Sequence, residues 1–557
     1  MKIVNKKIFL VLGAVLGMSS CIKDFQEVNT NRLYPNDEQS QLDGLASAGL
    51  FAELIQAPIP TGTGVNPANN YQVVQNMSAD NWAGYFSPGR NHWDRGLNQT
   101  SFFVSDGRAN GTFNTLIVNV MNQYFKIKGT LHNVEAVDGK LIYTERDEIS
   151  KTMYAIAKIV KVLGIHRATD LFGPIPYNDM QPGKQQAKYD PQELVYKTFL
   201  KELDESVAQL TSFGLGNKVL EGFDPLYQGN VAKWAKLGNS LMLRLAMRVR
   251  YADESLARTY VQKAVTSSAG LIETVDEVAK LTSNGKFILH NSLVIMDGYG
   301  ELKMGATIYS YLKGYNDPRI GKYFNKGKVK GSENLTDDYY AVRSGIDPKT
   351  DAGVYENYST PNVLSDTPTY LFKASEVYFL LAEAALANFQ SKGTAQTMYE
   401  KGVQLSFLEN GLSEEQAQEY LMDEESKPAD YNDKKNANYN QSAVSQITKH
   451  WNDNANEEEK LERIITQKYL AIFPNGFEAW TEWRRTGYPR MFKVPFNLSN
   501  VNAQNVTDDG KDNGMRRFPF PRNEFELNNK NVTEAKAFLG GADNAATNVW
   551  WDKKTKK

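Results

Sequence analysis

Three stretches in the first half of the chain repeat apolar residues at intervals of three, four and seven. Because an α-helix turns once in about 3.6 residues, these intervals place the apolar side chains on one helical face. The stretches run from Met153 to Gly173, from Pro191 to Leu210 and from Val231 to Arg250. Their apolar faces consist of Ile156, Ile159, Val160 and Leu163; Leu194, Phe199, Leu203, Val207 and Leu210; and Trp234, Leu237, Leu241, Leu245 and Val249. The pattern predicts three consecutive packed helices.

The helical pattern resumes in the second half of the chain. Residues 374–389 and 395–407 predict two antiparallel helices within about 34 residues, the size of a tetratricopeptide unit. Residues 457–489 predict a further helix, a turn at Pro474 to Gly476, and a second helix that carries Trp480 and Trp483. Leu461, Ile464, Ile465, Tyr469 and Ile472 are expected to face inward. The fold class is therefore mainly α, a scaffold of tetratricopeptide-like helical pairs.

Polar, turn-rich segments interrupt this pattern. Gly270 to Tyr311 is rich in glycine and has short apolar runs that fit either strands or extended loops. Asn325 to Thr369 has few apolar runs, and we expect a long surface insertion there. Residues 426–440 form a second polar stretch. We expect residues 39–557 to form a single α-helical domain with loop-rich insertions near 270–369 and 426–440.

The N-terminus has the pattern of an export signal. Lys2, Lys6 and Lys7 precede an apolar run of residues 8–17, and two serines come directly before Cys21. This run is too short to span a membrane, and its end resembles the bacterial lipobox, with Met18 where leucine is usual. Residues 1–20 are expected to be a lipoprotein signal peptide and 21–38 a tether lipidated at Cys21. The alternative is a leader cut elsewhere, with Cys21 incidental.

Composition excludes several functions. A net charge of −2 gives no field that favours nucleic acid. Cys21 is the only cysteine, so the mature body has no internal disulfide, thiolate metal site or cysteine nucleophile. The five histidines form no zinc motif, and no serine elbow or phosphate loop is present. Asp508, Asp509 and Asp512 resemble part of a calcium loop, but a solvated turn is the simpler interpretation. We expect no metal, no cofactor and no catalysis.

Residues 81–96 hold four aromatic residues among glycines and a proline, an arrangement that favours a loop. Aromatic faces pack on sugar rings, and nearby polar groups bond hydroxyls. The ligand-binding candidates here are Trp82, Tyr85, Phe86 and Trp93, with the polar groups Asn81, Arg90, His92 and Asp94. Alternatively, the rings anchor the loop to the helical body, and then Trp93 is the ring most expected to stay exposed. Trp480 and Trp483 are expected in the core, with Arg484 and Arg485 paired to carboxylates or helix ends.

Five segments, in order, resemble the SusD/RagB family of Bacteroidetes outer-membrane lipoproteins. They are "CIKDFQEVN" from Cys21, "ATDLFGPIPYND" from Ala168, "ASEVYFLLAEAAL" from Ala374, "QKYLAIFPNGFEAWTEWRRTGYP" from Gln467 and "RRFPFPRNEFELN" from Arg516. Typical members carry Glu-x-x-Arg-Trp-x-Asp-x-Arg where this chain has "AIFPNGFEAWTEWRR", which indicates a divergent SusD-like branch.

The resemblance implies a lipid-anchored protein of the outer membrane, exposed at the cell surface, which binds oligosaccharide and delivers it to a SusC-like TonB-dependent transporter. It implies tetratricopeptide-like helix pairs with loop-rich inserts that hold the ligand. It also places Tyr299 and Tyr309, which precede Asp317 to Arg319, near that ligand. Three alternatives remain open: a peptide ligand within the same family, a surface-anchored glycoside hydrolase, and a purely structural surface protein.

Overall fold

The computed structural model describes residues 45–59, 69–90, 99–138, 140–284, 286–329, 337–347, 354–511 and 513–556. Two units follow from the packing, residues 1–50 and 51–557. Of the first unit, only the start of helix α4 is described. The expected signal peptide, the tether and Cys21 lie outside the described residues.

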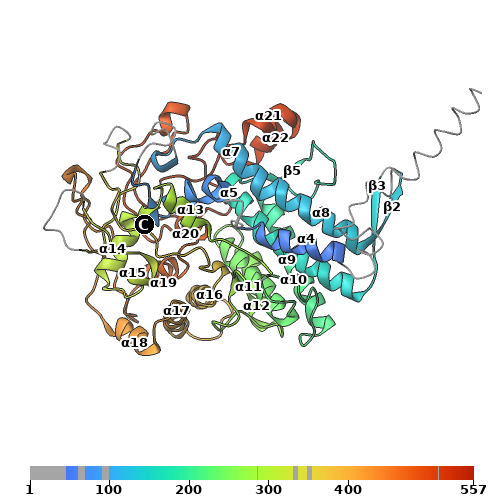
Figure 1. The fold of residues 1–557 in the computed structure, drawn as a ribbon, viewed down its shortest axis with the longest axis horizontal. Coiled ribbons are helices and arrows are strands. Elements are labelled where there is room, and N and C mark those ends of the chain that lie inside the picture. Colours follow the sequence, from blue (N-terminus) through green and yellow to red (C-terminus); the bar gives the residue numbers. More distant parts are fainter. Residues whose placement is uncertain are drawn as a thin grey trace, which may run out of the picture. The chain divides into compact units, whose positions relative to one another are not determined.

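The first helices pack in sequence order, each against the next. Helix α9 lies between α8 and α10, and α11 lies between α10 and α12 (Figure 1). These elements and those before them are α4 (Leu45–Gln56), α5 (Asn69–Tyr71), η1 (Gln72–Asn76), α6 (Ala79–Trp82), η3 (Gln99–Ser101), α7 (Asp106–Phe113), η4 (Asn114–Asn119), α8 (Val120–Leu131), α9 (Glu148–Phe172), α10 (Gln192–Phe213), α11 (Val231–Arg248) and α12 (Glu254–Thr266).

The later helices include a second antiparallel set, in which α16 packs against both α17 and α19. The elements are α13 (Ser292–Gly298), α14 (Ala306–Gly314), α15 (Ile320–Tyr323), α16 (Ala374–Leu386), α17 (Ala395–Glu409), α18 (Glu414–Met422), η5 (Ala437–Tyr439), α19 (Glu457–Ala471), α20 (Gly476–Thr486), η6 (Ser499–Asn502), α21 (Arg522–Leu527), α22 (Asn529–Ala535) and η7 (Lys536–Phe538). The predicted mainly helical fold of paired helices is confirmed.

Strands are few and short in the described part of the chain. Four antiparallel pairs form, β1 with β7, β2 with β3, β4 with β5 and β6 with β8. Their bounds are β1 (Phe86–Ser87), β2 (His132–Val137), β3 (Lys140–Glu145), β4 (Ile175–Pro176), β5 (Tyr189–Asp190), β6 (Ala279–Leu281), β7 (Lys303–Met304) and β8 (Thr369–Phe372). The β2–β3 pair is a hairpin whose residues are mostly exposed, whereas β1–β7 and β6–β8 join segments that are far apart in the sequence.

The helices begin where the sequence supplies capping side chains. Asp147 Oδ1 accepts the backbone N–H of Ser150 at 2.7 Å at the start of α9, and Asn230 caps α11 in the same way. Such caps satisfy donors that the first helical turn leaves unpaired. The predicted faces of α9 and α11 are buried. On α10 the prediction is wrong for Leu194, which is 45% exposed while Val195 lies inward, and the other four predicted residues are buried.

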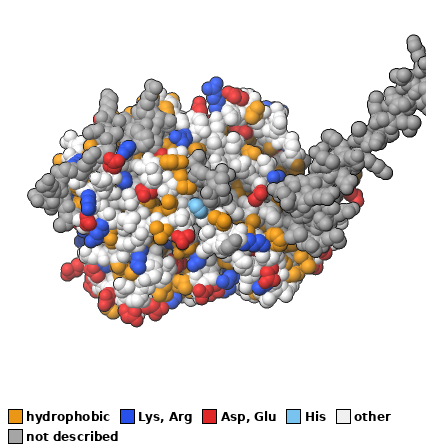
Figure 2. Space-filling view, viewed as in Figure 1, with side chains coloured by type: hydrophobic (Ala, Val, Ile, Leu, Met, Phe, Trp, Pro, Cys, Tyr) orange, Lys and Arg blue, Asp and Glu red, His pale blue; other side chains and the backbone are white. Residues whose placement is uncertain are grey.

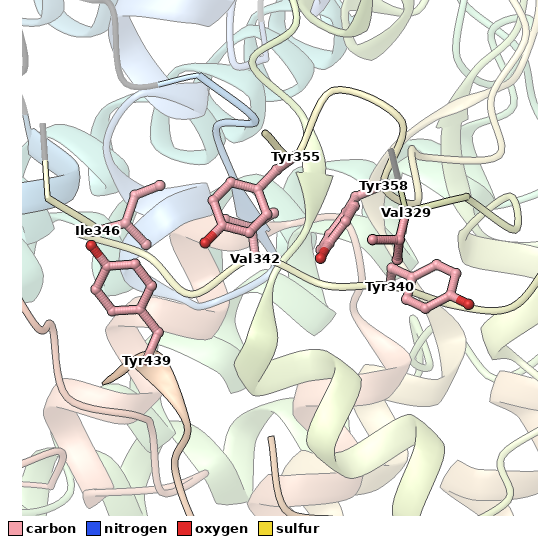
Figure 3. Packing of buried hydrophobic residues seen from close by; sticks show 7 residues of the cluster. All are labelled: Val329, Tyr340, Val342, Ile346, Tyr355, Tyr358 and Tyr439. Carbon is pink, nitrogen blue, oxygen red and sulfur yellow. The ribbon is translucent and has the colours of Figure 1, made fainter. Parts of the chain in front are cut away.

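Two segments differ from the sequence-based expectation. Gly270 to Tyr311 contains the strands β6 and β7, but it also contains helix α13 and the beginning of α14, which the sequence did not predict. The Asn325–Thr369 segment is not a surface insertion throughout. It contributes most of a buried cluster made of Val329, Tyr340, Val342, Ile346, Tyr355, Tyr358 and Tyr439 (Figure 3).

This cluster is rich in tyrosine, and for that reason the segments that form it show no apolar run in the sequence. The rings of Tyr355 and Tyr358 lie 5.1 Å apart, edge to face, and the Tyr355 hydroxyl donates to Asp433 Oδ2 at 3.2 Å. Tyr431 donates to the same oxygen at 2.9 Å. A buried tyrosine needs such an acceptor for its hydroxyl. The two polar stretches therefore pack on each other and hold residues 354–356 in place.

A buried ion network joins five helices. It comprises Asp170 of α9, Arg244 and Arg248 of α11, Glu376 and Glu383 of α16, Lys468 of α19, and Glu478, Glu482 and Arg485 of α20. Arg244 holds both oxygens of Glu376, at 2.7 and 2.6 Å. Arg485 holds both oxygens of Glu383, at 2.6 Å each. Buried charges are tolerated when they are paired and hydrogen-bonded in this way.

The network predicts sensitivity to acid. Burial by itself would raise the pKa of Glu482, but the charges of Arg485 and Lys468 outweigh burial and lower this pKa to about 2. A carboxylate with a depressed pKa stabilises the fold fully above its unfolded pKa and loses that contribution as the pH falls. We expect the free energy of unfolding, measured with denaturant, to fall steeply between about pH 4.5 and pH 2. A flat profile over this range would contradict the assignment.

Within the described residues, no helix is at once long and apolar enough to cross a lipid bilayer.

Candidate functional site

The short strand pair β1–β7 brings together two segments that the sequence singled out separately. Phe86 pairs with Met304 and Ser87 with Lys303. Just beyond the strands, the N–H of Gly89 donates to the carbonyl of Gly300 at 3.3 Å. The end of the aromatic loop and residues 297–303 therefore lie side by side.

A third segment meets them at Gly89. A side-chain carbon at this glycine would lie 2.9 Å from Cε of Lys303 and 3.4 Å from the carbonyl oxygen of Tyr355. Next to it, Arg90 forms an ion pair with Glu356, and both side chains are 44% exposed. We call the surface formed by Arg90, Asp297, Tyr299, Lys303 and Glu356 the Arg90 surface.

The charges on the Arg90 surface act on one another. Burial lowers the pKa of Lys303, and Arg90 adds to this effect, whereas the carboxylates of Asp297 and Glu356 oppose it. Burial raises the pKa of Asp297, and the charge of Lys303 opposes that shift. Two cationic and two acidic groups thus lie on one surface, where Lys303 and Asp297 are partly shielded from solvent.

Tyr299 is the aromatic residue next to this contact in the chain, because its neighbour Gly300 accepts from the N–H of Gly89. It follows helix α13 and is 45% exposed. An exposed ring beside fixed donors and acceptors is the combination that a sugar requires, because C–H groups on a sugar face pack on the ring while its hydroxyls bond to polar groups. The Arg90 surface is therefore chemically suited to bind an oligosaccharide.

Three aromatic candidates from the sequence belong to the core. Trp82 lies 4.8 Å from Trp480 between ring centroids, and its indole N–H donates to the carbonyl of Gln99 at 2.9 Å. Tyr85 and Phe86 are fully buried and pack against Phe473, at 5.1 and 5.5 Å. These rings anchor the loop, which is the alternative that the sequence left open, and they position Arg90.

The remaining candidates have different places. His92, Trp93 and Asp94 lie outside the described residues. Tyr309 is half-buried in α14, and its ring lies 6.5 Å from that of Tyr431, so it packs against the 426–440 stretch. Asn81 is buried and donates to the carbonyl of Asn76.

The tryptophans of α20 are buried, as expected. Arg485 pairs with carboxylates, and Arg484 donates to the backbone carbonyl of Asp170 at 2.6 Å, which confirms the expectation for both arginines. Asp508 accepts the N–H groups of Val494 and Gly510, at 2.6 and 2.9 Å, so its oxygens close a turn. No group of three or more metal-ligating side chains occurs among the described histidines, aspartates and glutamates.

Sequence reasoning missed Asp297, Lys303 and Glu356. The first two lie in a segment that was noted only for its tyrosines, and Glu356 lies in the presumed surface insertion. No periodic pattern marks these residues, because only the β1–β7 pairing and the tyrosine cluster bring them together. On the face shown in Figure 2, acidic side chains gather along the lower edge, and elsewhere described side chains of both charges are spread among hydrophobic ones.

Comparison with protein-family models identifies the same family that the five sequence segments resemble. A family model described as "SusD-like: Susd and RagB outer membrane lipoprotein" matches residues 27–552. A search of curated proteins gave no match.

Solved structures resemble the whole fold. A chitin-binding SusD homologue from Flavobacterium johnsoniae is 33% identical, with a TM-score of 0.80 over 92% of this chain and 99% of that one. A SusD homologue from Bacteroides vulgatus is 32% identical, with a TM-score of 0.82 over 93% and 100%. Another from Bacteroides uniformis is 34% identical, with a TM-score of 0.78 over 92% and 99%.

Proposed function

Because this chain belongs to the SusD-like family of outer membrane lipoproteins, we propose that it binds an oligosaccharide at the cell surface and delivers it, uncut, to a SusC-like TonB-dependent transporter. One observation carries the binding role: three segments far apart in the sequence converge at Gly89, which lies next to the Arg90–Glu356 ion pair in the chain and contacts Gly300, the neighbour of the exposed Tyr299. The lipid anchor at Cys21 would keep this surface outside the cell.

Chitin oligosaccharides are the first ligands to test. The similar structure from Flavobacterium johnsoniae is described as chitin-binding, and the Arg90 surface has both the ring and the polar groups that such a ligand uses. A peptide ligand is the alternative within the family. Its backbone would use the same donors and acceptors but would gain less from stacking on Tyr299.

Hydrolysis is the second candidate, and one observation favours it. The pKa of Asp297 is raised by burial, as a general acid requires, and Glu356 contributes a second carboxylate to the same surface. Incubation with chitohexaose separates the two functions. Intact sugar after long incubation supports binding alone, whereas shortened products that disappear in Asp297→Asn would establish a hydrolase.

Replacing Tyr299 with alanine should weaken chitohexaose binding by about 1–3 kcal/mol, because an exposed aromatic side chain at the centre of a contact contributes about this much. Isothermal titration of the soluble form, which begins at Ile22, measures the effect. The unfolding curve should stay at its wild-type position, because the ring is 45% exposed and little packing is lost.

Phe538→Ala is the matched control. Phe538 is also 45% exposed, but it lies in η7, outside the segments that form the Arg90 surface. Its replacement should leave affinity unchanged. Equal affinity in wild type and Tyr299→Ala, or a collapse of stability in Tyr299→Ala, would remove Tyr299 from the proposed site.

A further inference from the structure

Lys303 has an unusual environment for a lysine. Its side chain is only 6% exposed, and its stem runs against Gly89, where an added carbon would lie 2.9 Å from Cε. Among the described residues, no hydrogen bond or ion pair is formed by its ammonium group. Arg90 on the same surface, by contrast, is paired with Glu356.

The ammonium nitrogen is not one of the buried side-chain atoms that lack a partner, so the tip of the side chain reaches the surface. Its three donors are available there to an acceptor. The lysine stem lies against Gly89, next to Arg90 in the chain, and the charges of Asp297, Glu356 and Arg90 act on its ammonium group. The position is suited to an acceptor that arrives with a ligand.

The surrounding charges indicate which acceptor fits. Arg90 and Lys303 are cationic, and Glu356 and Asp297 are acidic, so the four groups carry no net charge when all are ionised. An anionic sugar would gain from the two cations but would meet two carboxylates. A sugar with a free amine would bring a third cation close to Lys303. A neutral acceptor avoids both repulsions.

We propose that Lys303 donates to the acetamide carbonyl of an N-acetylated sugar, and that this contact makes the site select N-acetylated oligosaccharides. An amide carbonyl is a strong neutral acceptor, and a hydrogen bond from a charged donor is stronger than one between neutral groups. The inference rests on the proposed binding function and assigns to it a ligand class and a residue that determines specificity.

Four hexasaccharides test the proposal by titration against the soluble form that begins at Ile22: chitohexaose, cellohexaose, fully deacetylated chitosan hexamer and hexagalacturonate. They carry, respectively, an acetamide, a hydroxyl, an ammonium and a carboxylate as the distinguishing group. Wild type should prefer chitohexaose to each of the others by about tenfold or more, as one charge-assisted hydrogen bond provides.

Lys303→Met keeps the length of the side chain but removes the donors. We expect the preference for chitohexaose over cellohexaose to fall below about threefold, with cellohexaose affinity nearly unchanged. Lys303→Arg should retain much of the preference. Folding should tolerate the methionine, because no described partner is lost. Gly89→Ala gives an independent test, since its methyl group would displace the lysine stem and should reduce the same preference.

The outcomes separate the two claims. If wild type binds chitohexaose and Lys303→Met keeps the full preference, the inference about Lys303 is wrong while the binding function stands. If hexagalacturonate or the deacetylated hexamer binds best, the ligand class is wrong. If wild type binds none of the four sugars, the proposed glycan-binding function itself is overturned, and the inference with it.

Discussion

Replacing Glu478 with glutamine is expected to lower the free energy of unfolding by about 3–5 kcal/mol, the usual cost of removing one partner from a buried ion pair. Glu478 accepts from Arg248 at 2.6 Å and from Lys468 at 3.3 Å. All three side chains are nearly inaccessible to solvent. The glutamine fits the same space but leaves two cations with less compensation, and water cannot reach them. Equilibrium denaturation followed by circular dichroism measures the loss.

The control is Glu205→Gln, which removes an exposed partner of Lys201 on helix α10. An exposed pair of this kind contributes about 1 kcal/mol or less, because solvent already screens it. We therefore expect the free energy of unfolding to fall much further in Glu478→Gln than in Glu205→Gln. If Glu478→Gln destabilises the chain no more than Glu205→Gln does, the network does not hold the five helices together in the way described.

Replacing Cys21 with alanine is expected to abolish membrane retention. Each buried methylene of an acyl chain contributes about 0.8 kcal/mol, and two or more chains anchor a protein stably. Removal of the thiol removes the attachment point for all of them. Fractionation of cells that produce the full chain, followed by immunoblotting, measures the redistribution from the membrane to the soluble fraction.

Lys23→Ala serves as the comparison, since it alters the same segment but leaves the thiol intact. That variant should remain in the membrane fraction and should incorporate labelled fatty acid. Continued membrane retention of Cys21→Ala, at the level of Lys23→Ala, would show that the anchor is not at this residue.

The helical body could be predicted from the sequence because its apolar spacing is regular. Helices α9, α11 and α19 bury the predicted faces, and capping residues such as Asp147 and Asn230 mark where two of the helices begin. Leu194 is an exception, because it is predicted on the buried face of α10 but is exposed. It lies nine residues before Leu203, which is about half a turn around the helix, so it points away from the buried face, and Val195 lies inward in the same turn.

The tyrosine cluster and the Arg90 surface could not be predicted in this way. Tyr355 and Tyr439 are apolar in their rings and polar at their hydroxyls, so a segment that contains them looks like a surface loop even when it is buried. Lys303 and Glu356 are ordinary charged residues until β1 pairs with β7. Sites assembled from loops depend on contacts between distant segments, and a single sequence does not display those contacts.

A structure of the mature chain with bound chitohexaose tests the central claim most directly. The account predicts ordered sugar against the ring of Tyr299, with polar groups of the ligand bonded to Arg90 and an acetamide carbonyl bonded to the Lys303 ammonium. Sugar bound only at a distant surface, such as the cleft lined by Tyr251, Phe389 and Glu457, would contradict it.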